Sequence, residues 1–297
     1  MKTWIRRSVA GVAALLAVAV VALAVAVLLG ERKRDRHVAV AVAPVAYRDD
    51  AAGIERGGYL FRSRGCAECH GAAGAGHVLI DDDAGMLVRA PNITPAAGSV
   101  VAAYTPSDWV RTIRHGVKPD GRPVLIMPSE DYNRLTDADL AAIVAYVRQL
   151  PRAPGASGLV RFPLPVKVLY SVGLMRDAAE KIDHRLPPAE PVAEGVSAAH
   201  GAYVANGCIG CHRAGLVGGK IAGVPPSWPA AARLAPGEGS VLPRYRDAQA
   251  FAAMLKTGKR PDGSAVSPVM PFASLRELSE VDTQALYLYL TTMKGQS

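Results

Sequence analysis

The strongest hydropathy feature of the chain is an uncharged run near its start. Ser8 to Gly30 holds 23 residues without a charge, most of them Ala, Val or Leu. About 20 apolar residues suffice to cross a bilayer as a helix, so this run predicts a transmembrane helix. A cleaved signal peptide is the alternative, but its apolar region would cover roughly 7 to 15 residues. The length of the run therefore favours an uncleaved anchor, with a basic flank, over residues 1–36.

Beyond a short tether at residues 37–49, apolar positions recur at helical spacing. One helix is expected from Gly57 toward the first cysteine, and another carries Trp109 and Ile113 on one face. A third helix runs from Leu140 to Val147 and is preceded by Thr-Asp-Ala-Asp, which is typical of a capped helix start. Strand-like alternation is scarce. The pattern predicts an all-α protein.

The order of elements in the first half of the chain returns in the second half. The matching segments are Gly57-Gly58-Tyr59 with Gly201-Ala202-Tyr203, Trp109–Gly121 with Phe251–Gly263, and Thr136 with Ser279. Such self-similarity indicates duplication. We therefore expect two tandem units, residues 50–152 and 196–297, joined by a Pro-rich linker at 153–195. The apolar run Val166 to Met175 within that linker is expected to lie on a domain or on the membrane surface.

Charge is concentrated outside the predicted units. The chain has 297 residues and a net charge of +8, of which residues 1–36 carry +5 through seven Lys or Arg against two acidic residues. Only +3 remains for the rest of the chain. A nucleic-acid-binding protein would normally carry a basic stripe on its folded part. The distribution of charge therefore argues against a nucleic-acid partner.

The candidate chemistry lies in two copies of Cys-x-x-Cys-His, residues 66–70 and 208–212. This motif is typical of covalent c-type haem attachment. The two copies use all four cysteines of the chain, so none is left for a disulfide. The sequence predicts two covalently bound haem c groups. Their thioether bonds are expected from Cys66, Cys69, Cys208 and Cys211, and their proximal iron ligands from His70 and His212.

Each motif has a candidate for the sixth iron ligand in a Met-Pro pair. Met127 follows His70 by 57 positions, and Met270 follows His212 by 58. Methionines usually fill gaps in a core, but the equal spacing favours His/Met ligation, which raises the reduction potential. Met175 is interpreted as a packing residue. Three further histidines are weaker candidates and are expected at the surface, namely His77, His115 and His200.

Other charged residues leave alternatives open. Arg89, Arg111 and Arg114 either pair with haem propionates, whose carboxylates suit a guanidinium, or face solvent. Asp81-Asp82-Asp83 is interpreted as a solvated loop in preference to a calcium site. A basic run precedes each methionine loop and either docks an acidic partner or simply ends a helix. The first run holds Arg111, Arg114, Lys118 and Arg122, and the second holds Lys256, Lys259 and Arg260.

With these motifs the chain resembles the membrane-anchored multihaem cytochrome c subunits of periplasmic dehydrogenases for alcohols, sugar acids and related substrates. The resemblance covers nearly everything after residue 50. It rests on both Cys-x-x-Cys-His motifs, Pro91-Asn92-Ile93-Thr94-Pro95, Arg161-Phe162-Pro163, Gly201-Ala202-Tyr203 and both Met-Pro pairs. The chain departs from the family in having two motifs where three haems are common, and in lacking a second Asn-Ile-Thr-Pro loop.

These observations lead to a di-haem electron carrier. It is expected to take electrons from a periplasmic dehydrogenase or a quinol-oxidising complex and pass them to a terminal oxidase or a soluble cytochrome. Covalent haem attachment in bacteria occurs outside the cytoplasmic membrane, so a single-pass protein with periplasmic haem domains is expected. The alternative is an enzyme such as a di-haem peroxidase, which needs an open iron position. Two matched Met-Pro loops argue against that alternative.

Overall fold

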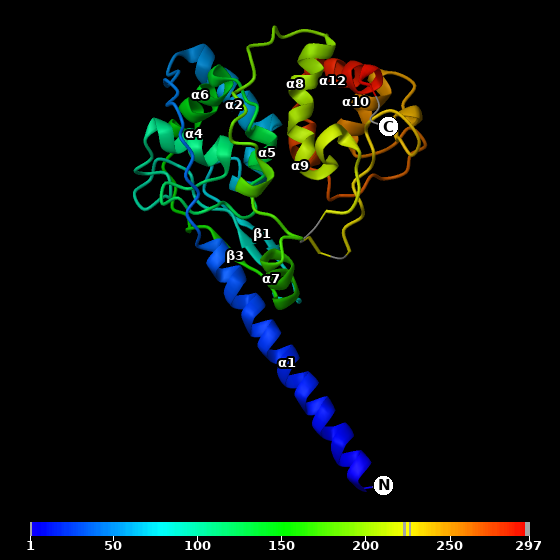
Figure 1. The fold of residues 1–297 in the computed structure, drawn as a ribbon. Coiled ribbons are helices and arrows are strands. Elements are labelled where there is room, and N and C mark those ends of the chain that lie inside the picture. Colours follow the sequence, from blue (N-terminus) through cyan, green and yellow to red (C-terminus); the bar gives the residue numbers. More distant parts are fainter. Residues whose placement is uncertain (1, 222–223, 226, 295–297) are drawn as a thin grey trace.

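The computed structural model describes residues 2–221, 224–225 and 227–294 (Figure 1). Residue 1 of the predicted anchor and residues 222, 223, 226 and 295–297 of the predicted second unit lie outside this description. A long apolar helix, α1 (Lys2–Arg34), projects from a globular part (Figure 1). Among the described residues it is the one helix long and apolar enough to cross a membrane, and its most apolar stretch is not buried within the protein. A signal sequence would share these properties.

The first half of the globular part is a group of helices around one apolar core. Its helices are α2 (Ala51–Ser63), α3 (Cys66–His70), α4 (Pro106–His115), α5 (Ser129–Tyr132) and α6 (Asp137–Arg148). The core includes Leu60, Trp109 and Leu140. Thr136 caps α6 by accepting a hydrogen bond from the Asp139 backbone N–H, as the sequence pattern predicted.

The second half repeats this arrangement around a core of its own. Its helices are α8 (Ala198–Ala205), α9 (Ile209–His212), α10 (Ala248–Thr257), α11 (Phe272–Leu275) and α12 (Glu280–Thr292). Single 3₁₀ turns occur at Asn206–Cys208, Ala214–Leu216 and Leu242–Arg244. Ser279 caps α12 through the Asp282 backbone N–H, in the same way that Thr136 caps α6.

Close packing at a glycine joins the first and last helices of each half. A methyl group placed on Gly57 of α2 would lie 1.9 Å from the Ala142 carbonyl oxygen of α6. The same test at Gly201 of α8 gives 1.9 Å to the Ala285 carbonyl oxygen of α12. Only glycine lets the two backbones approach this closely. The Gly-x-Tyr match between the halves thus reflects a shared packing requirement.

A small sheet corrects the expectation of an all-α protein. β1 (Val78–Asp81), β2 (Leu87–Arg89) and β3 (Leu159–Arg161) form an antiparallel sheet in the order β1-β2-β3. Two of these strands have three residues each, which is too short to display a period of two along the sequence. The third strand comes from the predicted linker, so its pairing is set by distant parts of the chain.

The predicted linker also packs against the end of α1. It contains α7 (Leu164–Ser171) and a 3₁₀ turn at Ala179–Lys181. Arg36, just past α1, donates to the fully buried carboxylate of Asp177 at 2.9 Å, and Lys33 donates to the Tyr170 carbonyl oxygen at 2.9 Å. The outer end of α1 is therefore an integral part of the packed structure.

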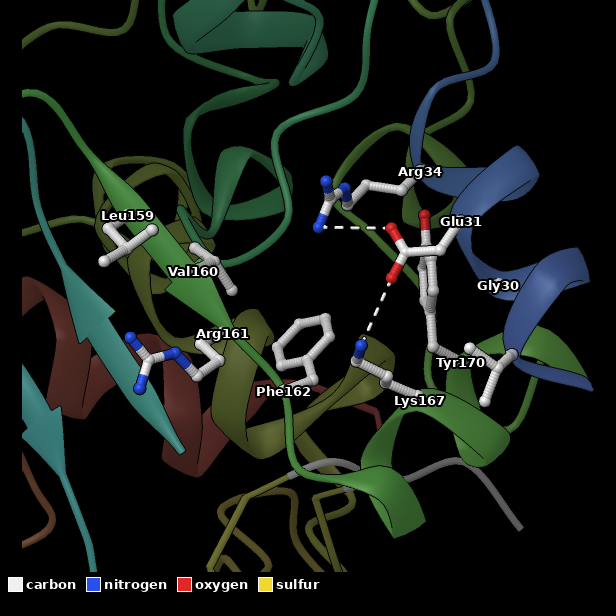
Figure 2. Close-up of a pocket in the computed structure, with 10 residues that line it drawn as sticks. Gly30, Glu31, Arg34, Leu159, Val160, Arg161, Phe162, Lys167 and Tyr170 are labelled. Atoms are coloured by element: carbon white, nitrogen blue, oxygen red, sulfur yellow. Dashed lines mark ion pairs between the residues drawn. The ribbon is translucent and has the colours of Figure 1, made fainter. Parts of the chain in front are cut away.

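A cavity of about 150 Å³ lies between α1, β3 and α7 (Figure 2). Figure 2 shows Glu31 of α1 between two cations, with its carboxylate 3.3 Å from Arg34 and 3.3 Å from Lys167 of α7. Phe162 and Tyr170 line the same space. The Glu31–Lys167 pair joins α7 to the last turns of α1, whereas the Glu31–Arg34 pair lies within α1.

The two halves exchange matching contacts across their interface. The Tyr59 hydroxyl of α2 donates to Asp282 at 2.6 Å and accepts from the Ser279 backbone N–H at 3.2 Å. The Tyr203 hydroxyl of α8 donates to Asp139 at 2.7 Å and accepts from the Thr136 backbone N–H at 3.2 Å. Each tyrosine thus completes the N-terminus of the last helix in the other half.

Candidate functional site

The first Cys-x-x-Cys-His motif forms the short helix α3, entered through Gly65 with φ +84°. At its end, the Nδ1–H of His70 donates to the carbonyl oxygen of Pro91 at 2.9 Å. In a metal-binding histidine, such a hydrogen bond from the ring nitrogen that does not bind the metal fixes the tautomer and the ring orientation. It leaves Nε2 of His70 with a free lone pair. Pro91 belongs to the Pro-Asn-Ile-Thr-Pro loop, whose role is thus to present a backbone carbonyl.

The second motif has the same geometry. The Nδ1–H of His212, at the end of α9, donates to the carbonyl oxygen of Ala232 at 2.8 Å. Burial is the main factor that lowers the pKa of both His70 and His212, which favours the neutral imidazole that binds metals. The second half therefore keeps the function of the Asn-Ile-Thr-Pro loop without its residues. Residue patterns carry no signal for Ala232, because only its backbone takes part.

The turns after the two motifs share positive φ at three matching positions, and the second turn has a further one at Gly215, with φ +70°. The first turn has φ +77° at Gly71, +72° at Gly74 and +76° at Gly76, and the second has +67° at Arg213, +57° at Leu216 and +72° at Gly218. In each turn the last of these N–H groups donates to the carbonyl oxygen of the motif histidine, at 2.8 and 2.9 Å. Positive φ is uncommon for residues other than glycine. Arg213 and Leu216 nevertheless adopt it, at the positions that Gly71 and Gly74 occupy in the first turn.

The two methionine loops also share one conformation. Pro128 has φ −79° and ψ 66°, and Pro271 has φ −77° and ψ 66°. In both loops the methionine carbonyl oxygen accepts a backbone hydrogen bond at 2.8 Å from two residues onward. Met127 packs on the first apolar core together with Cys66, and Met270 packs on the second together with Cys208. The structure thus brings a cysteine and the predicted methionine of each half to one core.

The chemistry of the donor set fits covalent haem. Burial raises the pKa of the Cys66 and Cys208 thiols to about 12. Such thiols carry almost no thiolate at neutral pH, which makes them poor redox or nucleophilic groups. Two thiols, one neutral imidazole and one thioether are the groups that c-type haem requires, and the sequence of each half supplies this set.

Each Cys-x-x-Cys-His motif, called a proposed attachment loop below, contacts the short helix that follows the methionine loop of the other half. The Gly210 backbone N–H of the second motif donates to Asp131 of α5 at 2.6 Å. The Ser274 backbone N–H of α11 donates to Glu68 of the first motif at 2.9 Å. Burial, followed by the charge of Glu130, raises the pKa of Asp131 to about 8. Sequence reasoning did not find this exchange, because the partners lie 79 and 206 positions apart.

Two of the three further histidines are buried, which corrects the expectation that they lie at the surface. Nε2 of His200 is 2.7 Å from Asp282, and Nδ1 of His115 is 3.1 Å from Nδ1 of His184. Each is engaged by a partner distant in sequence. His77 is exposed, as expected.

The three arginines proposed for haem propionates lie in the first half and have partners within the protein. Arg89 donates to the Ser157 carbonyl oxygen, and Arg111 pairs with Asp108. Arg114 is buried against Asp137 and the Leu135 carbonyl oxygen, so it cannot dock a partner.

By contrast, Lys256 and Lys259 are exposed and enter no ion pair within the part of the chain the structure describes. The run Lys256, Lys259 and Arg260 is called the second-unit basic run below. In the first half, Arg122 pairs with Asp120 and Asp35. The second-unit basic run therefore has lysines outside ion pairs among the described residues, whereas Arg122 of the first run is paired.

Asp81 of the aspartate triplet ends β1, and Asp82 and Asp83 lie in the turn toward β2. The Asp82 carboxylate accepts from the Met86 backbone N–H at 2.9 Å. Across residues 2–221, 224–225 and 227–294, no group of three or more His, Cys, Asp or Glu is placed to hold a metal ion. Asp81 and Asp83 are exposed, in agreement with the interpretation of the triplet as a solvated segment.

Comparison with known proteins finds c-type cytochromes. Residues 52–147 match the family described as cytochrome C oxidase, cbb3-type, subunit III. The chain is 32% identical over 133 residues to the fructose dehydrogenase cytochrome subunit of Gluconobacter japonicus, covering 42% of this chain and 27% of that protein. It is 29% identical over 178 residues to the cytochrome c subunit of a quinone alcohol dehydrogenase of Gluconobacter oxydans, covering 55% and 35%.

A third relative covers more of the chain. A nicotinate dehydrogenase subunit of Pseudomonas putida is 27% identical over 269 residues, which is 83% of this chain and 22% of that protein. The chain thus spans about a quarter to a third of the length of the relatives it matches.

Proposed function

We propose that the chain, whose residues 52–147 match a cytochrome family and which is similar to cytochrome subunits of dehydrogenases, is a di-haem electron-transfer subunit. Cys66, Cys69, Cys208 and Cys211 would attach the two haems. His70 with Met127, and His212 with Met270, would bind the irons. The observation that carries the proposal is the repeated arrangement in which a motif histidine is oriented by a carbonyl oxygen 21 or 20 positions onward.

In this proposal the protein residues hold and tune the cofactors. The haem groups supply one-electron oxidation and reduction. The Pro91 and Ala232 carbonyls keep each imidazole in its binding tautomer. The methionine thioethers would raise the reduction potentials of the irons that they bind. Both attachment loops border the interface between the halves, and this placement supports electron exchange within the chain.

The proposed partners follow the names of the relatives. Those proteins are cytochrome subunits of fructose and alcohol dehydrogenases, so a periplasmic dehydrogenase or a quinol-oxidising complex is the proposed donor. A terminal oxidase or a soluble cytochrome is the proposed acceptor. Co-purification of the detergent-solubilised protein with its neighbours tests both partners. Recovery of oxidase subunits without a dehydrogenase would contradict the proposed donor.

The proposed location is the cytoplasmic membrane, with α1 as an uncleaved anchor and the remainder in the periplasm. Support comes from Val27 and Gly30, whose packing against Lys167, Tyr170 and Ser171 would be lost on cleavage at the end of the apolar run. The mature protein should therefore begin near Met1 and fractionate with membranes. An N-terminus beyond Arg36 would refute the anchor.

Haem content is the direct test of the site. A pyridine haemochrome assay should give two haems per chain. The double variant Cys208→Ala with Cys211→Ala should give one, with the first site retained. One haem in the unchanged protein would refute the second site, and non-covalent haem would refute both attachments.

A further inference from the structure

An apolar stripe on α7 faces away from the protein. Leu164, Val168 and Val172 follow one another at intervals of four, which places them on one side of the helix. Leu164 and Val172 are 46% and 61% exposed, and Leu174 in the turn after the helix is 66% exposed. The opposite side carries Tyr170, which is buried in a small core with Phe162. The helix is thus amphipathic, with an unpartnered apolar side.

The position at which α7 crosses α1 indicates what lies next to the apolar side of α7. A methyl group placed on Gly30 would lie 3.3 Å from the Lys167 carbonyl oxygen and 3.6 Å from Ser171 Cβ, so α7 crosses α1 at this residue. Val27, one turn earlier, lines the cavity that Tyr170 and Lys167 also line. Val27 and Gly30 both belong to the uncharged run that begins at Ser8. The globular part therefore touches the apolar part of α1 itself.

The length of that run sets the height of α7 relative to a bilayer. Twenty-three helical residues rise roughly 34 Å at 1.5 Å each, and the hydrocarbon core is about 30 Å thick. The run therefore only just spans the core, and Gly30 falls at its outer boundary. Glu31, Arg34 and Lys167 form their ion pairs directly beyond it (Figure 2), at the level of lipid head groups.

We propose that α7 and the turn at residues 172–174 form a second membrane contact, with Leu164, Val172 and Leu174 inserted into the periplasmic face of the bilayer that α1 spans. The occupant of the apolar side is phospholipid, because α7 is fixed to a helix that continues into the membrane. Amphipathic helices bury their apolar side at this boundary. Two contacts would fix the orientation of the globular part relative to the membrane. This inference rests on the proposed anchor.

Spin labels in the full-length holoprotein test the contact. Leu174→Cys, Val196→Cys and Leu16→Cys are labelled singly in phospholipid nanodiscs, with both irons ferrous, low-spin and hence diamagnetic. Power saturation compares access by oxygen, which concentrates in lipid, with access by a water-soluble nickel chelate. Val196 is the matched control, because it is also an exposed apolar residue and lies beside the start of α8, away from α1 (Figure 1). Leu16 reports on α1.

The three labels separate the two proposals. The expected result is that the labels at positions 16 and 174 favour oxygen severalfold more than the label at position 196. If the label at 174 behaves like that at 196 while the label at 16 favours oxygen, the second contact is refuted and the anchor stands. If the label at 16 is also exposed to the nickel chelate, or is lost by cleavage, both proposals fail. A label introduced by Val172→Cys should repeat the result at 174.

Discussion

Replacing Gly57 by alanine tests the helix packing on which both halves depend. The added methyl group would lie 1.9 Å from the Ala142 carbonyl oxygen, 2.6 Å from its carbonyl carbon and 2.8 Å from Tyr146 Cβ. An ordinary contact begins at 3.4 Å, so α2 and α6 would have to separate by roughly 1.5 Å. Two of the three atoms belong to the backbone and cannot rotate away.

The size of the effect follows from two opposing contributions. Overpacking of a core costs about 1–3 kcal/mol, and occasionally more. A rigid backbone obstacle places Gly57→Ala at the upper end of that range. Alanine regains up to about 1 kcal/mol through its higher helix propensity. We therefore expect Gly57→Ala to lower the free energy of unfolding by about 2 kcal/mol, which corresponds to a fall in Tm of roughly 10 °C for a unit of this size.

The neighbouring glycine is the matched control. A methyl group on Gly58 would meet the Tyr146 ring at 2.9 Å, and a ring edge can move. The second half carries Ala202 at the corresponding position. Gly58→Ala should therefore change the free energy of unfolding by less than about 1 kcal/mol. Thermal and urea unfolding of the holoproteins in detergent, followed by circular dichroism, measure both variants. Equal stability of the two would refute the argument.

Three further predictions concern the site, the surface and pH. Met127→His or Met270→His should keep low-spin haem but lower the reduction potential of that centre. The control variant Met175→Leu should leave both reduction potentials and the near-infrared Met-to-iron band unchanged. Survival of that band in a Met127→His, Met270→His double variant would refute the ligand assignment. Reversal of the second-unit basic run to glutamate should slow electron exchange with an acidic partner at low salt, where charges act over roughly 10 Å, and equal rates across an ionic-strength series would exclude docking there. Burial, with the nearby histidine and arginine, lowers the pKa of His115 to about 4. The stability that neutral His115 contributes is therefore present above pH 6.5 and is lost as the pH falls toward 4. His115→Asn should flatten this loss in acid unfolding curves, and an effect equal to that of the control His77→Asn would contradict the prediction.

Features governed by neighbouring residues were predictable from the sequence. The caps at Thr136 and Ser279 depend on a side chain and a backbone N–H three positions apart, and both are present. The repeated order of helices also followed from local patterns.

Features governed by distant backbone atoms were not predictable. A carbonyl oxygen such as that of Ala232 leaves no trace in residue identity, although it orients a proposed iron ligand. The burial of His200 depends on Asp282, 82 positions away. β3 pairs with β2 across some 70 residues, and its three residues carry no periodicity that could reveal it. Such contacts become visible only when the chain is folded.

The exchange of contacts between the halves has the form of a symmetric dimer contained in one polypeptide. A true isologous dimer must use every interface residue twice, so a change on one side always appears on the other. A single chain is free of that constraint. Arg56 pairs with Asp139 in the first half, whereas His200 pairs with Asp282 at the matching place in the second half. The contact at the second attachment loop uses a carboxylate of α5, that of Asp131, whereas the contact at the first uses a carboxylate of the loop itself, that of Glu68. The surroundings of the two proposed redox centres can therefore diverge one residue at a time, and an energy difference between them can arise without loss of the shared framework.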